Sequence, residues 1–112
     1  MNSSHYPPLP RQIDLGSGFH LNVLSDRIAT ITDSKGNRKT TYFGFHTEED
    51  ALRFKIAIEQ QGLGSAAIVR PSQRLSRVNW ECKVWGCATH LILALLERQS
   101  IVALNSTVLS QR

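Results

Sequence analysis

The sequence has no long apolar run. Its longest uninterrupted apolar stretch, from Leu91 to Leu96, is far shorter than the roughly 20 residues that a membrane-spanning helix needs. The N-terminal residues also lack a basic segment followed by an apolar one, which is the pattern of a secretion signal. We therefore expect a protein that has no membrane partner and is located in the cytoplasm.

Cysteine is scarce, with only Cys82 and Cys87 in the chain, and we expect both thiols to stay reduced. With His90 they form the spacing C-x4-C-x2-H, which offers three metal ligands. A structural zinc site needs four ligands, and the fourth would have to come from the distant His20 or His46. Buried thiols explain the pattern better, so we predict no metal site.

Motifs typical of enzymes are missing as well. Cys82 is predicted to point inward from a strand, where an apolar setting raises the thiol pKa and makes the thiol inert. The acids Glu48, Glu49 and Asp50 fit the start of a helix better than a catalytic pair. The G-S-G stretch at Gly16–Gly18 lacks the lysine of a phosphate-binding loop. These absences predict a non-enzymatic protein without a cofactor.

The length of the chain indicates one domain, because 112 residues supply one adequate core but not two. A hydrophobic fraction of 41% with 20% charged residues is ordinary for a globular protein. The first residues are rich in proline, which favours extended and solvated chain. We predict a flexible arm over residues 1–12, a single α+β domain over 13–99 and a C-terminal tail over 100–112 whose structure the sequence leaves open.

Alternating apolar and polar residues predict three strands in the first half of the chain. Phe19, Leu21 and Val23 share one face of the first strand, with His20 and Asn22 on the other. A second strand is expected over 27–32, rich in Ile and Thr, followed by a turn, DSKGN. These segments predict a hairpin.

The third strand is predicted over Arg38 to Phe45, where the alternation continues. Lys39, Thr41, Phe43 and Phe45 fall on one face of this strand, and Phe43 and Phe45 are expected to point to the core. Arg38, Thr40 and Tyr42 then fall on the opposite side, which we expect to be an exposed outer face shared with His20 and Asn22.

A helix is predicted directly after this strand. Thr47 suits the N-cap, Asp50 stands at the capping-box position, and the neighbouring acids suit the positive end of the helix dipole. The helix is expected to end near Gln61, because Gly62 readily adopts the left-handed conformation that closes helices.

The helix has two apolar stripes. One contains Ala51, Phe54 and Ile58, and the other lies on a different side of the helix. A later apolar segment wraps most of the circumference of its own helix. Since leftover apolar surface is normally covered by a partner, an alternative function is a protein-interaction module or assembly factor, with a protein partner or a homo-oligomer such as a dimer. The residues predicted for this contact are Leu52, Ile56, Leu91 and Leu95.

The second half of the chain predicts another hairpin and helix. Strands are expected over 66–71 and 77–85, joined by the loop PSQRLS, with Val78, Trp80, Cys82 and Val84 facing the core. A helix is expected from Cys87 to about Gln99. The fold class is therefore predicted as α+β, with an antiparallel sheet of about five strands in the order ββ-β-α-β-β-α and two helices packed on it.

Basic residues surround the predicted turns of both hairpins, and the chain has a net charge of +4 with a pI of about 9.5. Such residues contact phosphates, while polar and aromatic side chains on a sheet face bind or stack on bases. An ordinary solvated sheet face would explain the same charges, so both interpretations stay open. The residues predicted to bind nucleic acid are Arg27, Lys35, Arg38, Lys39, Thr40, Tyr42, Arg70, Arg74 and Arg77.

Three short strands followed by Y-F-G-F-H-T-E-E-D-A-L-R-F resemble the βββα unit of AP2-type and integrase arm-type DNA-binding domains. The resemblance covers Phe19 to Gln61. It implies a sheet that enters the major groove and a DNA-contacting role for Arg27, Arg38, Thr40 and Tyr42. The chain departs from the family in the spacing of Ala51 and in the second hairpin and helix that follow.

Overall fold

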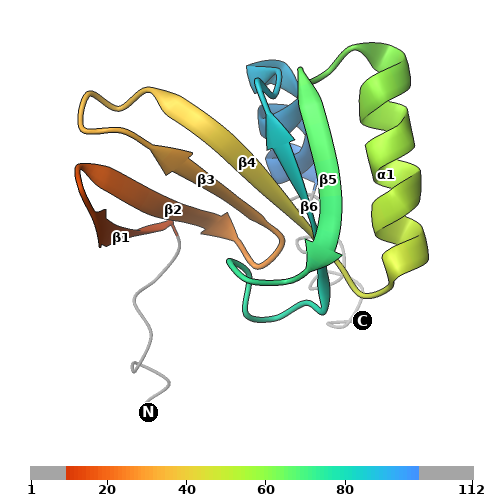
Figure 1. The fold of residues 1–112 in the computed structure, drawn as a ribbon, viewed down its shortest axis with the longest axis horizontal. Coiled ribbons are helices and arrows are strands. Elements are labelled where there is room, and N and C mark those ends of the chain that lie inside the picture. Colours follow the sequence, from red (N-terminus) through yellow and green to blue (C-terminus); the bar gives the residue numbers. More distant parts are fainter. Residues whose placement is uncertain (1–9, 99–112) are drawn as a thin grey trace, which may run out of the picture.

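A computed structural model describes residues 10–98 of the chain as a six-stranded antiparallel sheet with two helices (Figure 1). The strand order in the sheet is β1-β2-β3-β4-β6-β5. The elements are β1 (Arg11–Gly16), β2 (Phe19–Ser25), β3 (Ile28–Thr32), β4 (Arg38–Phe45), α1 (Glu48–Gln61), β5 (Ala66–Pro71), β6 (Trp80–Trp85) and a C-terminal helix described over residues 89–98. The predicted α+β class with an antiparallel sheet and two helices is confirmed. Within residues 10–98, no helix is long and apolar enough to cross a membrane.

The sheet has one strand more than predicted, because β1 was missed. Arg11 and Gln12 begin this strand, so they do not belong to the predicted arm over 1–12. β1 and β2 are joined by a tight turn in which Gly16, Ser17 and Gly18 all have positive φ angles. Glycine adopts such angles without steric cost, which explains why the G-S-G stretch lies here. Residues 1–9 and the predicted tail over 100–112 lie outside the described residues.

The helix α1 begins and ends where the sequence predicts. The Asp50 N–H donates to the Thr47 side-chain oxygen at 3.1 Å, which satisfies one of the free donors at the helix start. Gly62 closes the helix with a left-handed φ of 64°. Local capping chemistry is therefore sufficient to fix both ends of this element.

Both helices pack on one face of the sheet, called the inner face. The core here contains Ile28 and Phe43 from the sheet, Ile58 from α1 and Ile92 from the C-terminal helix. Phe54 of α1 lies against Phe43 and Phe45, with ring centroids 4.7 Å and 5.1 Å apart. The predicted inward orientation of Phe43 and Phe45 is confirmed.

A second core lies on the opposite face of the sheet, called the outer face. Loop residues 72–79, between β5 and β6, fold back over this face and are called the cover loop. Leu75 and Val78 of the cover loop pack on Val23, Ala29 and Tyr42 of the sheet. The strands β3, β4 and β6 therefore bury side chains on both faces of the sheet.

This second core corrects three predictions about orientation. Tyr42 is only 1% exposed and Thr40 is also buried, so the outer face at β4 is not open to solvent as expected. Val78 belongs to the outer core and does not share a face with Cys82, which lies in the inner core. The physical reason is that the loop extends over residues 72–79, so it includes Val78 as well as Leu75, and burial of these two apolar side chains against the sheet is favourable.

Candidate functional site

Part of the outer face remains uncovered and forms a hollow of about 440 Å³. It lies at the end of the sheet where β2 begins and β3 ends, and neither Leu75 nor Val78 lines it. This site is called the basic groove and is defined by the lining residues Leu15, Phe19, Ile31, Lys39, Arg74 and Lys83.

A bulge in β4 separates two neighbouring basic residues. Ile31 pairs with Thr40 but Thr32 pairs with Arg38, so Lys39 has no partner on β3. Lys39 lines the basic groove, whereas the Arg38 guanidinium donates to the Cys87 carbonyl and to the Thr89 hydroxyl at the start of the C-terminal helix. Arg38 therefore holds the helix in place, and its predicted position on a face with Thr40 and Tyr42 is wrong.

The floor of the groove is formed by the buried pair Thr40 and Tyr42, whose hydroxyl groups lie 3.4 Å apart. The Lys83 ammonium lies 5.8 Å from the Tyr42 ring centroid and 4.7 Å from that of Trp85. Attraction between a cation and the negative face of an aromatic ring favours this position. These two rings therefore orient Lys83 at the edge of the groove.

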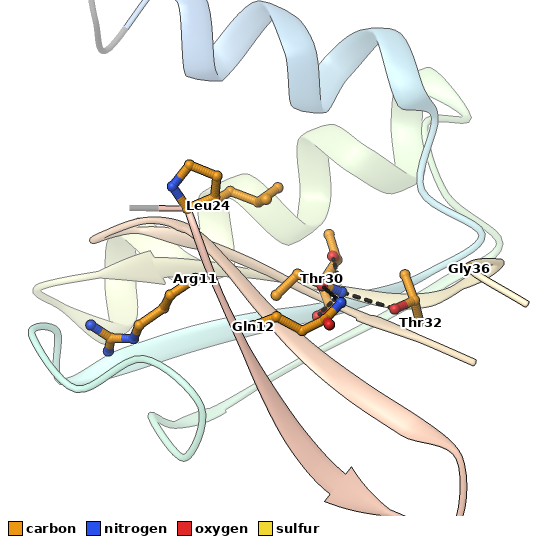
Figure 2. Close-up of a pocket in the computed structure, with 8 residues that line it drawn as sticks. Arg11, Gln12, Leu24, Thr30, Thr32 and Gly36 are labelled. Atoms are coloured by element: carbon orange, nitrogen blue, oxygen red, sulfur yellow. Dashed lines mark hydrogen bonds between the residues drawn. The ribbon is translucent and has the colours of Figure 1, made fainter. Parts of the chain in front are cut away.

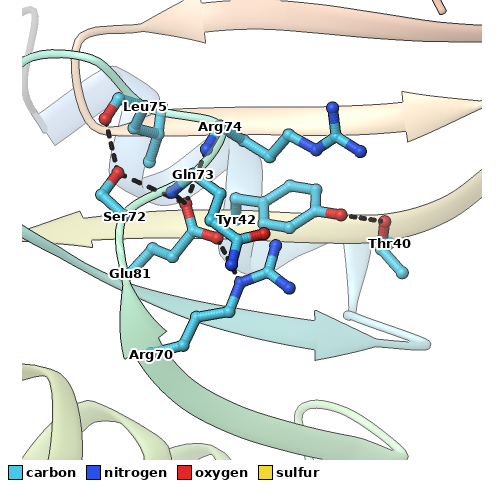
Figure 3. Close-up of polar contacts among 8 residues, drawn as sticks. All are labelled: Thr40, Tyr42, Arg70, Ser72, Gln73, Arg74, Leu75 and Glu81. Carbon is cyan, nitrogen blue, oxygen red and sulfur yellow. Dashed lines mark hydrogen bonds and ion pairs between the residues drawn. The ribbon is translucent and has the colours of Figure 1, made fainter.

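The buried carboxylate of Glu81 organises the cover loop (Figure 3). Its Oε1 accepts from the backbone N–H groups of Gln73 and Arg74, at 3.1 Å each. Its Oε2 accepts from Arg70 Nε at 2.6 Å, and the Glu81 side chain is 0% exposed. The charge of Arg70 is therefore paired with that of Glu81, and Arg70 is not among the lining residues of the groove.

Arg74 belongs to this loop, and its side chain lines the same hollow as Thr40 and Tyr42, the residues drawn with it in Figure 3. Within residues 10–98, neither Arg74 nor Lys83 forms an ion pair. Lys39 is paired with Asp33 at 3.6 Å, and the side chain of Lys39 is more than half exposed. No acidic residue of the described chain lines the groove, so its local charge is positive.

Asp33 reduces this positive charge at one side only. Its carboxylate accepts from the backbone N–H groups of Asn37 and Lys35 in the β3–β4 turn. The hydrogen bond from Asn37 holds the pKa of Asp33 below its ordinary value of 3.8. Asp33 is therefore ionised at neutral pH and offsets part of the charge of Lys39.

The other predicted nucleic-acid residues lie away from the groove. Arg27 contacts His46, with 2.7 Å between Nη2 and Nε2, in the region where β2 turns into β3. Arg77 pairs with Asp26 at 3.7 Å on an exposed surface. Lys35 lies in the β3–β4 turn. Of the predicted set, the structure brings together Lys39, Thr40, Tyr42 and Arg74.

Sequence reasoning missed the apolar wall of the groove and one of its cations. Phe19 is 39% exposed and faces the groove with Leu15 and Ile31. Lys83 stands between Cys82 and Val84, which were predicted to face the core. The alternation of β6 therefore already implied that Lys83 lies on the outer face.

A second hollow, of about 460 Å³, lies on the inner face beside β1, β2 and β3 (Figure 2). Asn22 joins the strands here, accepting from the Gln12 amide at 2.8 Å and donating to the Thr32 hydroxyl at 3.0 Å. Asn22 therefore lies on the face opposite Tyr42, contrary to prediction. Since these polar groups bond to one another, we assign them a role in strand pairing.

The residues predicted for protein contact do not form one surface. Leu52 and Ile56 of α1 are 43% and 50% exposed. Leu91 and Leu95 are half-buried and pack against the inner core of the same chain. Leu91 and Leu95 are therefore less exposed than Leu52 and Ile56, and a protein contact through these four residues stays a prediction.

The two cysteines are free thiols in the inner core. Burial raises the pKa of Cys82 to about 12 and also raises the pKa of Cys87. The prediction that Cys82 is buried with a raised pKa is confirmed. Among residues 10–98, no group of three or more His, Cys, Asp or Glu side chains is placed to hold a metal.

The raised pKa of Cys82 leads to a pH-dependent stability. Between pH 9 and pH 12 the unfolded chain releases the thiol proton while the folded chain keeps it, so stability falls as the pH rises. We expect this thiol to lower the free energy of unfolding by about 1.4 kcal/mol between pH 8 and pH 10. Urea unfolding of the wild type and of Cys82→Ala at both pH values measures it. Equal pH dependence in the two proteins would contradict the expectation.

Comparison with protein-family models, with curated proteins and with solved structures gave no match. The resemblance to AP2-type and integrase arm-type domains therefore stays a prediction.

Proposed function

We propose that this chain is a non-enzymatic protein that binds nucleic acid through the basic groove. The observation that supports the proposal is the grouping of Lys39, Arg74 and Lys83 around an apolar wall, with no acidic residue in the lining. Arg74 and Lys83 are not neutralised by ion pairs within residues 10–98. A polyanion with flat apolar bases complements both properties of this surface.

The two kinds of side chain have separate roles in this proposal. The three cations bind phosphates, which supplies affinity that is largely independent of sequence. The apolar wall of Leu15, Phe19 and Ile31 contacts sugar or base. Glu81 contributes indirectly, because it fixes the backbone of Arg74 before a ligand arrives.

Fluorescence anisotropy of a labelled mixed-sequence oligonucleotide tests the proposal. We expect binding at about 20 mM salt that weakens as salt rises, because phosphate contacts release counterions. Arg74→Ala/Lys83→Ala should reduce the affinity by roughly tenfold or more and make the salt dependence less steep. A matched control is Arg53→Ala/Lys55→Ala, which removes the same charges from α1.

The control pair is expected to bind almost as well as the wild type, because it leaves the basic groove intact. Circular dichroism melting curves check that both variants are folded. The proposal is overturned if the wild type shows no binding at low salt, or if the two variants lose the same affinity.

A further inference from the structure

We infer that the basic groove accepts a single strand of nucleic acid and not a duplex; this inference rests on the proposed function. A duplex reader places side chains of a sheet or helix into the major groove, which is about 12 Å wide and admits a two-stranded ribbon. That mode requires the outer face of the sheet to be exposed over its central strands.

The outer face of this sheet is blocked at its centre. Leu75 and Val78 of the cover loop lie over β4, and Tyr42 is buried beneath them. β4 therefore cannot enter a groove of DNA while the cover loop is in place.

Two features hold the cover loop against the sheet. At Gly44 of β4 the missing side chain lets Val78 approach so closely that a Cβ would lie 2.6 Å from Val78 Cγ2. At the other side of the loop, Glu81 binds the backbone of Gln73 and Arg74. The cover is thus packed and hydrogen-bonded, and a duplex would have to displace both sets of contacts.

The groove that remains open has the size and chemistry for an unpaired nucleotide. Its volume of about 440 Å³ lies between the apolar residues Leu15 and Phe19 on one side and the cations Arg74 and Lys83 on the other. An unpaired base presents its flat face to an aromatic ring, whereas bases in a duplex are already stacked and paired. Only a single strand can therefore use the apolar wall and the cations together.

Phe19 is the residue whose replacement distinguishes single-strand binding from duplex binding. It is partly exposed on the groove wall, so its replacement leaves the two cores intact. Phe19→Ala should weaken single-strand binding about fivefold or more, because stacking on an aromatic side chain is lost. Phe19→Trp should retain the affinity. Ile56→Ala, which removes exposed apolar surface from α1, is the matched control.

The test uses the full chain and one labelled oligonucleotide of about 20 nucleotides, alone and annealed to its complement, as DNA and as RNA. At about 100 mM salt we expect the single strand to bind at least tenfold more tightly than the duplex, and Phe19→Ala to reduce that ratio. Equal or tighter duplex binding overturns this inference and leaves the proposed function standing. A preference for the single strand that Phe19→Ala does not change also overturns it. Binding of neither ligand at low salt overturns the proposed function itself.

Discussion

Glu81→Ala is expected to lower the free energy of unfolding by about 3–5 kcal/mol, because it leaves the partly buried Arg70 guanidinium without its partner and frees two backbone N–H groups. For a domain of this size the melting temperature should fall by about 12 °C or more. Urea unfolding followed by tryptophan fluorescence measures the loss, since Trp80 and Trp85 are the end residues of the same strand.

Two comparisons make the result at Glu81 specific. Glu59→Ala removes a carboxylate whose ion pair with Lys55 is partly exposed, and it should cost at most about 1 kcal/mol. Glu81→Gln keeps an oxygen acceptor for the backbone of Gln73 and Arg74 but loses the charge that faces Arg70, so an intermediate loss is expected. A loss at Glu81→Ala no larger than that at Glu59→Ala would show that the buried pair does not hold the cover loop.

Gly44→Ala is expected to lift the cover loop from the sheet. The added Cβ would lie 2.6 Å from Val78 Cγ2, closer than packed carbon atoms tolerate, and in a tight contact of 3.1 Å with Leu75 Cδ1. Overpacking of this kind costs about 1–3 kcal/mol. The lifted loop should also become sensitive to trypsin at Arg74 and Arg77, which gives a second measurement besides unfolding.

A double variant tests whether the clash with Val78 is the cause. Val78→Ala alone removes buried side-chain atoms and should destabilise the protein, because it leaves a cavity. In Gly44→Ala/Val78→Ala the new methyl group has room, so the combined loss should be smaller than the sum of the two single losses. Strict additivity, or an unchanged rate of trypsin cleavage in Gly44→Ala, would argue against this packing.

Features that depend on neighbouring residues were predictable from the sequence. The ends of α1 follow from Thr47 and Gly62, because capping is decided within one turn of the chain. The inward orientation of Phe43 and the raised pKa of Cys82 follow from alternation and burial in the same way.

Features that depend on distant contacts were not predictable. Simple alternation places Arg38 with Thr40, but the bulge at Lys39 separates them, and the register with β3 decides where a bulge occurs. The burial of Tyr42 depends on Leu75, which belongs to a loop whose sequence is mostly polar. The groove is the part of the outer face that the cover loop does not cover. No local sequence pattern predicts where that part lies.

The position of β6 in the sheet determines the order in which the strands can pair during synthesis. β1 to β4 pair in sequence order, whereas the only strand partner of β5 within residues 10–98 is β6, which also pairs with β4. During synthesis, β1 to β4 can pair while residues 80–85 are still inside the ribosome. β5 has no partner strand until those residues emerge. The second half of the domain should then assemble in one late step, and truncations that end before Trp80 should yield products that cells degrade.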